Sequence, residues 1–164
     1  MESKINLIEI SVAKNYFNRR RVGSKERKRL ISRGILIREK KFLESQYSFL
    51  DCKIVGNKLI VRGSFKPTTY SVTYYYRVEY DGLYSPSVFV EEPIIERNED
   101  IHMYPQDNSL CLYFPKDMKW DVKNHNVFDT IVPWTNEWFV FYEKYLISGK
   151  WEHPFVQHLR VKEK

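Results

Sequence analysis

The sequence contains few cysteines and few glycines. Among its 164 residues there are two cysteines, Cys52 and Cys111, and six glycines. Two cysteines so far apart cannot form the disulfide framework of a small secreted domain or a cysteine-rich zinc site. The few glycines form no Walker-type phosphate-binding loop, and no paired-carboxylate signature occurs. The sequence therefore excludes several common classes of enzyme and supplies two free thiols.

Long apolar runs are also absent. No stretch approaches the roughly 20 apolar residues that span a bilayer. The first ten residues, MESKINLIEI, include an early acid and lack the apolar core of a signal peptide. We therefore expect a cytoplasmic protein with reduced thiols and no membrane segment. Its 43% hydrophobic and 16% aromatic residues indicate a globular chain, which we expect to form one domain over residues 1–164.

The positive charge is concentrated at the start of the chain. Residues 1–45 contain 13 Lys or Arg and 5 Asp or Glu, whereas residues 46–164 contain 14 and 16. Residues 1–23 can form a basic arm, and the basic segment as a whole is either a solvated helix face or a surface for an acidic partner. Nucleic acid is a less favoured partner, because no aromatic side chains accompany the arm in a stacking pattern.

A helix followed by strands is the pattern of the first half. Ser24 is a good N-cap for a helix over residues 27–46, which Gly34 can divide in two. From residue 49 the period becomes that of strands, with turn signals at residues 56–57 and 81–82. Four strands of an antiparallel meander are predicted at residues 49–55, 58–65, 70–80 and 85–95. Cys52 lies in the first of them and is expected to be a small buried hydrophobe.

The second half contains a long irregular stretch and a helix. Residues 96–125 have no regular period, and loops of this length are often functional. A short apolar turn at residues 127–132 follows. Thr135 can then cap a final helix that runs to Ser148, with Gly149 as its stop signal. The order of helix, meander, loop and helix predicts an α+β fold.

The long loop contains most of the residues that can carry chemistry. Cys111 is the strongest nucleophile among them, because a thiolate attacks carbonyl carbon near neutral pH once its pKa is lowered or a base lies nearby. Leu110 and Leu112 can anchor the backbone and leave the sulfur at a surface groove. Asn108 or backbone amides can donate to the oxyanion of an acyl transfer. The alternative is a buried structural cysteine, the commoner state of an isolated thiol.

Further side chains can line or complete this site. Tyr113 and Trp120 can line the groove, although residues of this size more often pack in a core. His153 and His158 can fold back beside the thiol, one of them as a base, or remain exposed at the C-terminal tail. Together with His102 they match no compact zinc spacing. We therefore expect no metal and no cofactor.

The loop sequence HMYPQDNSLCLYFP, followed by Trp120, resembles the active-site stretch of ubiquitin-conjugating enzymes. In that stretch a His opens the loop, a Cys-Leu dipeptide carries the catalytic cysteine, and a Trp follows. The closer resemblance is to the prokaryotic branch of this family found in bacterial anti-phage operons of the CBASS type. It covers residues 58–158 and includes FKPTTYSVTYYYRVEY, SPSVFVEEPII and TIVPWTNEWFVFYEKYLISGKW.

This resemblance implies a ubiquitin-conjugating-like fold, with an N-terminal helix, a four-stranded antiparallel meander, a long active-site loop and a C-terminal helix. It implies that Cys111 forms a thioester with the C-terminus of a cGAS-like nucleotidyltransferase from the same operon. The thioester then passes to an amine and primes cyclic-oligonucleotide signalling. Charging of the cysteine can use a ubiquitin-activating-like partner enzyme or none. His102 matches the loop-opening His, whose role in the family is mainly structural.

The sequence departs from the eukaryotic pattern at one motif. His-Pro-Asn is replaced by His102-Met103-Tyr104, so the usual oxyanion-supporting Asn is missing, and Asn108 or Tyr104 can take its place. We therefore predict three catalytic residues and three that contact the substrate. The catalytic set is Cys111, His102 and Asn108, and the substrate-contacting set is Tyr104, Tyr113 and Trp120. The missing motif also favours a second hypothesis, a non-catalytic module that holds the synthase through the same groove.

Overall fold

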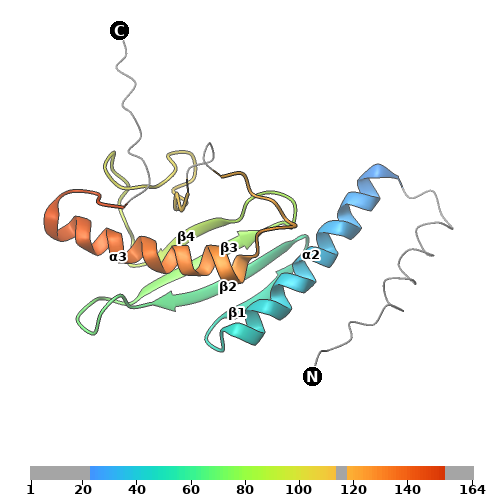
Figure 1. Ribbon diagram of the computed structural model, residues 1–164, viewed down its shortest axis with the longest axis horizontal. Coiled ribbons are helices and arrows are strands. Elements are labelled where there is room, and N and C mark those ends of the chain that lie inside the picture. Colours follow the sequence, from blue (N-terminus) through green and yellow to red (C-terminus); the bar gives the residue numbers. More distant parts are fainter. Residues whose placement is uncertain (1–22, 114–117, 154–164) are drawn as a thin grey trace, which may run out of the picture.

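The secondary structure follows the predicted order of helix, four strands and helix (Figure 1). The computed structural model describes residues 23–113 and 118–153. Of the predicted basic arm, residues 1–22 lie outside this part. The elements are α2 (Ser24–Gln46), β1 (Asp51–Val55), β2 (Lys58–Phe65), β3 (Tyr74–Tyr80), β4 (Ser87–Glu92), the short π-helix η1 (Val127–Ile131) and α3 (Val132–Ser148). The predicted α+β architecture is confirmed.

The four strands form one antiparallel meander in the order β1-β2-β3-β4. Successive side chains along each strand point to opposite faces, so one face is buried and the other is polar. The polar face carries ion pairs such as Arg62 with Glu91 and Lys58 with Glu79. The buried face consists of Cys52, Leu59, Val61, Tyr74, Tyr76, Val78, Tyr80 and Val88. The sheet therefore needs a cover on one side only, which the helices supply.

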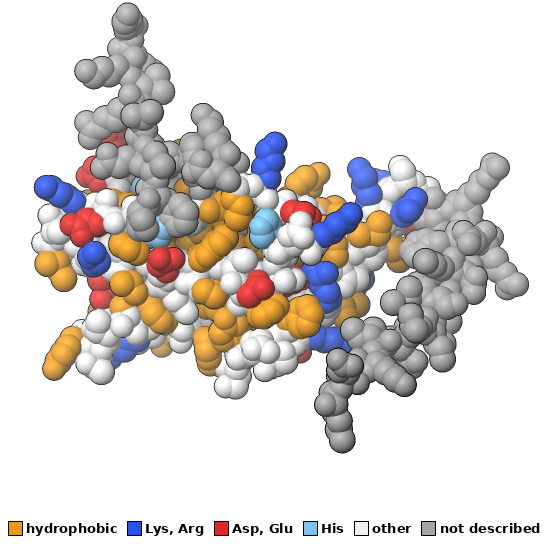
Figure 2. All heavy atoms as spheres, viewed as in Figure 1, with side chains coloured by type: hydrophobic (Ala, Val, Ile, Leu, Met, Phe, Trp, Pro, Cys, Tyr) orange, Lys and Arg blue, Asp and Glu red, His pale blue; other side chains and the backbone are white. Residues whose placement is uncertain are grey.

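Two helices pack on the apolar face of the sheet (Figure 1). Phe139 of α3 is fully buried and stacks on Tyr74, with ring centroids 4.5 Å apart. From α2, Leu36 and Leu43 are fully buried in the same core. Basic side chains gather on the exposed side of α2 (Figure 2), where they are open to solvent or to a partner. Within the described residues, no helix has both the length and the apolar character needed to cross a membrane.

Two predictions about α2 are wrong. The N-cap is Gly23 and not Ser24, and no side chain caps this end. Gly34 does not divide the helix, which continues unbroken for 23 residues. A single interior glycine costs only about 1 kcal/mol relative to alanine. Burial of Leu36 and Leu43, which follow Gly34 in the helix, outweighs that cost.

The start of α3 also differs from the prediction. The helix begins at Val132, directly after η1, and Thr135 lies inside it with its hydroxyl donating to the Ile131 carbonyl at 2.7 Å. Pro133 is tolerated in the first turn, because an amide hydrogen there has no partner within the helix. The predicted stop is confirmed: Gly149 is the C-cap and has φ of 69°, which favours glycine.

Candidate functional site

Cys111 lies on the returning arm of a narrow hairpin-like loop. The amide of Tyr104 donates to the Ser109 carbonyl at 2.8 Å, and the amide of Cys111 donates to the His102 carbonyl at 2.9 Å. Between these two contacts Met103 pairs with Leu110. The loop therefore brings together residues 102, 104 and 111, which the sequence predicts to belong to one site.

Local hydrogen bonds explain the sharp turn of this loop. Asn108 has φ of 58°, a left-handed conformation that Asn tolerates better than most residues. Its amide donates to the Tyr104 carbonyl at 2.9 Å, and its side chain is exposed. One carboxylate oxygen of Asp107 accepts from both the amide and the hydroxyl of Ser109. The loop is attached to the sheet by the Leu110 amide, which donates to the Val88 carbonyl of β4 at 2.8 Å.

The sulfur of Cys111 is buried, contrary to the expected open groove. The residue is only 8% exposed. Its thiol donates to the Tyr113 carbonyl at 3.5 Å, and it is hydrogen-bonded to the Tyr104 side chain. Burial raises the pKa of the Cys111 thiol, whereas the hydrogen bond with Tyr104 lowers it in part. The thiol is therefore mostly protonated at neutral pH.

A small polar pocket lies next to the thiol. It has a volume of about 180 Å³, and Tyr104 lines it while also touching the sulfur. None of its described lining residues is a Lys or Arg. The lining consists of Ser85, Pro86, Ser87, Tyr104, Gln106, Asp107, Ser109 and Leu110. The pocket is thus lined by Tyr104, which is hydrogen-bonded to Cys111, whereas Cys111 itself is not among the lining residues.

His102 contributes to this site through its backbone. Its carbonyl accepts the Cys111 amide and also the indole N–H of Trp138, at 3.0 Å. The imidazole of His102 stacks on Trp151, with ring centroids 5.1 Å apart and an interplanar angle of 14°. These contacts attach the loop to α3 and to the segment that follows it, which fits a structural role for this histidine.

Comparison with known proteins identifies the family. A family model described as "Type II CBASS E2 protein" matches residues 39–159, well over half of the chain. The chain belongs to the type II CBASS E2 family. This confirms the resemblance found in the sequence and places the protein in an antiviral defence system. No curated protein matches the chain.

Tyr113 and Trp120 of this CBASS E2 protein lie in different surroundings. The Tyr113 ring packs against Trp134 at 5.6 Å, and its hydroxyl is hydrogen-bonded to Ser85 at the pocket. The indole of Trp120 donates instead to the hydroxyl of Tyr80 at 3.2 Å, in the core below β3. Tyr113 therefore adjoins the predicted site, whereas the contacts of Trp120 are those of a packing residue.

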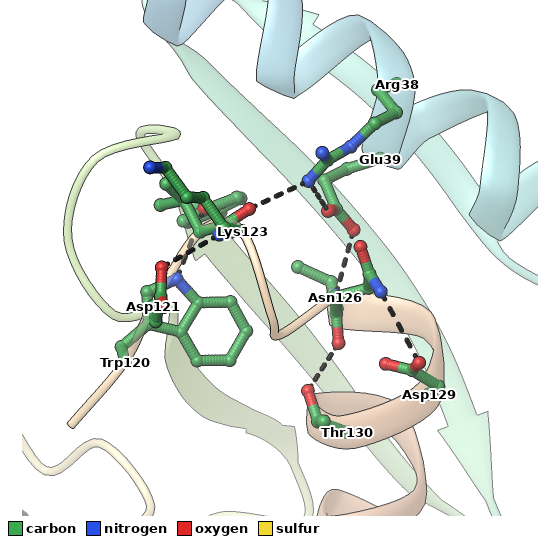
Figure 3. Close-up of polar contacts among 11 residues, drawn as sticks. Arg38, Glu39, Trp120, Asp121, Lys123, Asn126, Asp129 and Thr130 are labelled. Atoms are coloured by element: carbon green, nitrogen blue, oxygen red, sulfur yellow. Dashed lines mark hydrogen bonds and ion pairs between the residues drawn. The ribbon is translucent and has the colours of Figure 1, made fainter. Parts of the chain in front are cut away.

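The segment between Trp120 and η1 is attached to α2 by a buried carboxylate (Figure 3). Glu39 is fully buried and accepts the amide of Val127 at 2.8 Å. Arg38 donates both to this carboxylate, at 3.1 Å, and to the Val122 carbonyl, at 3.2 Å. Burial raises the pKa of Glu39, while the hydrogen bonds from Val127 and Arg38 oppose that rise. These contacts fix the chain between Trp120 and η1.

No metal centre is found in the described part of this CBASS E2 protein, where no three His, Cys, Asp or Glu residues gather as ligands. His153 lies against the Phe141 ring at 4.5 Å and 3.8 Å from a Glu137 oxygen. Burial lowers the pKa of His153. His158, the other histidine considered as a base, lies outside the described residues.

Several residues of the site were not predicted from the sequence. Trp138 belongs to the aromatic stripe of α3, which the sequence predicts to be core. Its hydrogen bond to the His102 carbonyl therefore could not be predicted from the sequence. Ser85 and Ser87 read as the start of a strand. Glu39 is different, because it recurs at helical spacing with Leu36 and Leu43 on the apolar face of α2. A charged residue at such a position indicates a buried polar contact.

Proposed function

We propose that this type II CBASS E2 protein is a cysteine acyltransferase with a ubiquitin-conjugating-like fold. In this proposal Cys111 carries the C-terminus of a cGAS-like nucleotidyltransferase as a thioester and passes it to an amine. This transfer primes cyclic-oligonucleotide signalling in the cytoplasm, where thiols stay reduced. The whole chain acts as one domain and needs neither a metal nor a cofactor. The family membership supports the class of protein, and the residues around the thiol support the chemistry.

The main support from the site is the hydroxyl of Tyr104 on the Cys111 sulfur beside a polar pocket. A thiol that accepts a hydrogen bond can become a thiolate more readily than one surrounded only by carbon. His102 holds the backbone of Cys111 in place through its carbonyl. Because the thiol is only 8% exposed, an acyl donor reaches it only after a side chain around the sulfur moves.

The test is formation of an adduct with the nucleotidyltransferase of the same operon, together with an activating enzyme where one is encoded. We expect a covalent adduct on a non-reducing gel that disappears when a small thiol is added. Cys111→Ala should abolish it, whereas Cys52→Ala should retain it. Cys111→Ser should give an adduct that thiol no longer cleaves, since an ester resists the thiol exchange that breaks a thioester. An adduct that survives in the Cys111→Ala variant would rule out this assignment.

Burial of the thiol favours a second candidate, a non-catalytic module that binds the synthase. A thiol with a raised pKa is a weaker nucleophile at neutral pH. In this case Cys111→Ala would keep both synthase binding and protection from phage. Loss of protection by a variant that still folds and binds would exclude it.

A further inference from the structure

The Tyr104 side chain connects the thiol to the polar pocket. Its hydroxyl is hydrogen-bonded to the Cys111 sulfur, and the same side chain lines the 180 Å³ pocket. The backbone places Tyr104 near Cys111, because the pair of Tyr104 and Ser109 lies two positions closer to the turn than the pair of His102 and Cys111. The Tyr104 side chain is therefore shared by the pocket and the thiol.

The sulfur has two polar neighbours with opposite effects on its charge. The Tyr113 carbonyl accepts the S–H and so holds the neutral thiol. The Tyr104 hydroxyl can donate to the sulfur, and a donated hydrogen bond stabilises the anion. Burial raises the pKa of Tyr104, so its hydroxyl keeps its proton and remains a donor at neutral and moderately alkaline pH.

We propose that Tyr104 is a catalytic residue of this E2 protein, whose hydroxyl donates a hydrogen bond to the Cys111 thiolate as it attacks and again as it departs. This inference rests on the proposed acyl transfer and names the group that supports it. Asn108 is not assigned this role, because its side chain is exposed at the turn of the loop, where its backbone is left-handed.

Both chemical steps place negative charge on the sulfur. In charging, the Cys111 sulfur attacks the carbonyl carbon of a donor thioester. The new C–S bond forms, the donor's C–S bond breaks, and the departing thiolate takes up the proton that Cys111 lost. In transfer, an amine attacks the Cys111 thioester. The C–S bond breaks with its electron pair on the Cys111 sulfur, and the surplus amine proton passes through water to that thiolate. The Tyr104 hydroxyl stabilises the thiolate in each case.

The test compares Tyr104→Phe with Tyr47→Phe. Each variant loses one phenolic hydroxyl and keeps its ring, but the hydroxyl of Tyr47 donates to the Phe128 carbonyl at 2.8 Å and not to the sulfur. The first readout is the rate at which iodoacetamide alkylates the full-length protein, measured between pH 6 and pH 10 on the Cys111 peptide by mass spectrometry. We expect Tyr104→Phe to move the midpoint of this profile to higher pH and Tyr47→Phe to leave it nearly unchanged.

The second readout is single-turnover chemistry. A thioester of a peptide with the synthase's C-terminal sequence charges the protein, and free lysine or hydroxylamine discharges it. We expect Tyr104→Phe to slow both steps by about 10-fold or more, as for loss of a group that stabilises charge in the transition state. Thermal unfolding shows whether each variant is folded. If folded Tyr104→Phe keeps the wild-type alkylation profile and wild-type transfer rates, the role of Tyr104 is disproved.

The two proposals can fail separately. If no adduct forms with synthase or peptide thioester but Tyr104→Phe still shifts the alkylation profile, acyl transfer is disproved, and so is the catalytic role of Tyr104. Only the effect of the Tyr104 hydroxyl on the ionisation of the Cys111 thiol would then stand. If adducts form through Cys111 and Tyr104→Phe changes neither readout, acyl transfer stands and the role of Tyr104 fails alone.

Discussion

Cys52 and Cys111 are buried to nearly the same degree, yet their surroundings differ. They are 6% and 8% exposed. Cys52 lies on β1, opposite Val61 on the apolar face of the sheet, and burial raises the pKa of its thiol to about 11, with nearby Glu44 adding to the rise. Cys111 lies on a loop, where a phenolic hydroxyl reaches its sulfur and a polar pocket begins one side chain away.

Burial alone therefore does not separate these two cysteines. What differs is the group that touches the sulfur and the route by which a reagent can reach it. The two regions are also held differently. The sheet side is held mainly by packed aromatic and aliphatic side chains, whereas the loop side is held by hydrogen bonds, in which Trp138 and Leu110 donate and Glu39 accepts.

The largest effect is expected on the sheet side. Phe139→Ala removes a fully buried ring that stacks on Tyr74 and leaves a cavity between α3 and the sheet. We expect the free energy of unfolding to fall by about 3–5 kcal/mol. Urea denaturation followed by circular dichroism measures it. The exposed Val140→Ala on the same helix is the control and should cost less than about 1 kcal/mol. Equal losses for the two variants would contradict an aromatic core here.

A direct comparison of the two thiols should give the next largest effect. At pH 8 we expect iodoacetamide to label Cys111 about 10-fold or more faster than Cys52, because a thiol of pKa about 11 is almost entirely protonated at that pH. Peptide mapping by mass spectrometry measures both rates in one sample. Labelling of both sites at the same fast rate under unfolding conditions checks that each peptide is detected. Faster labelling of Cys52 in the native protein would reverse the comparison.

The sheet was predictable because its signals are local. Alternating residues bounded by Gly56 and Pro67 gave β2 its observed limits, residues 58–65. The helix starts and the break at Gly34 were not predicted correctly, because Ser24, Gly34 and Thr135 were interpreted by local propensity alone. Tertiary contacts override such weak local preferences.

At the candidate site, the sequence correctly grouped the residues of the short loop. It did not correctly place a residue that follows that loop. His102, Tyr104 and Cys111 come together because a short loop must fold back on itself. Trp120 lies nine positions beyond Cys111 and turns to the core, where Tyr80 accepts its N–H. The sequence left open whether the thiol lies in a groove or is buried, because this depends on its contacts with Tyr104 and Tyr113 in the folded loop.

The smallest effect is expected at the buried carboxylate of the loop side, and it depends on pH. Burial is the largest influence on Glu39 and raises its pKa above the usual 4.5, so the folded protein holds this proton more tightly than the unfolded chain. The stability that this group contributes is therefore fully present below pH 4.5 and is lost as pH rises through the folded-state pKa. Glu39→Gln, which does not ionise, lacks this dependence.

We therefore expect the wild type to lose stability relative to Glu39→Gln as pH rises from 4 towards neutrality, and the two to differ by no more than about 1–2 kcal/mol at pH 7. Gln can still accept the Val127 amide, whereas Glu39→Ala cannot and should cost about 1–3 kcal/mol more at every pH. Urea unfolding at several pH values measures all three proteins. If the wild type instead gains stability over Glu39→Gln with rising pH, the bonds from Arg38 and Val127 outweigh burial, and the loop is attached to α2 by a charge and not merely by a hydrogen bond.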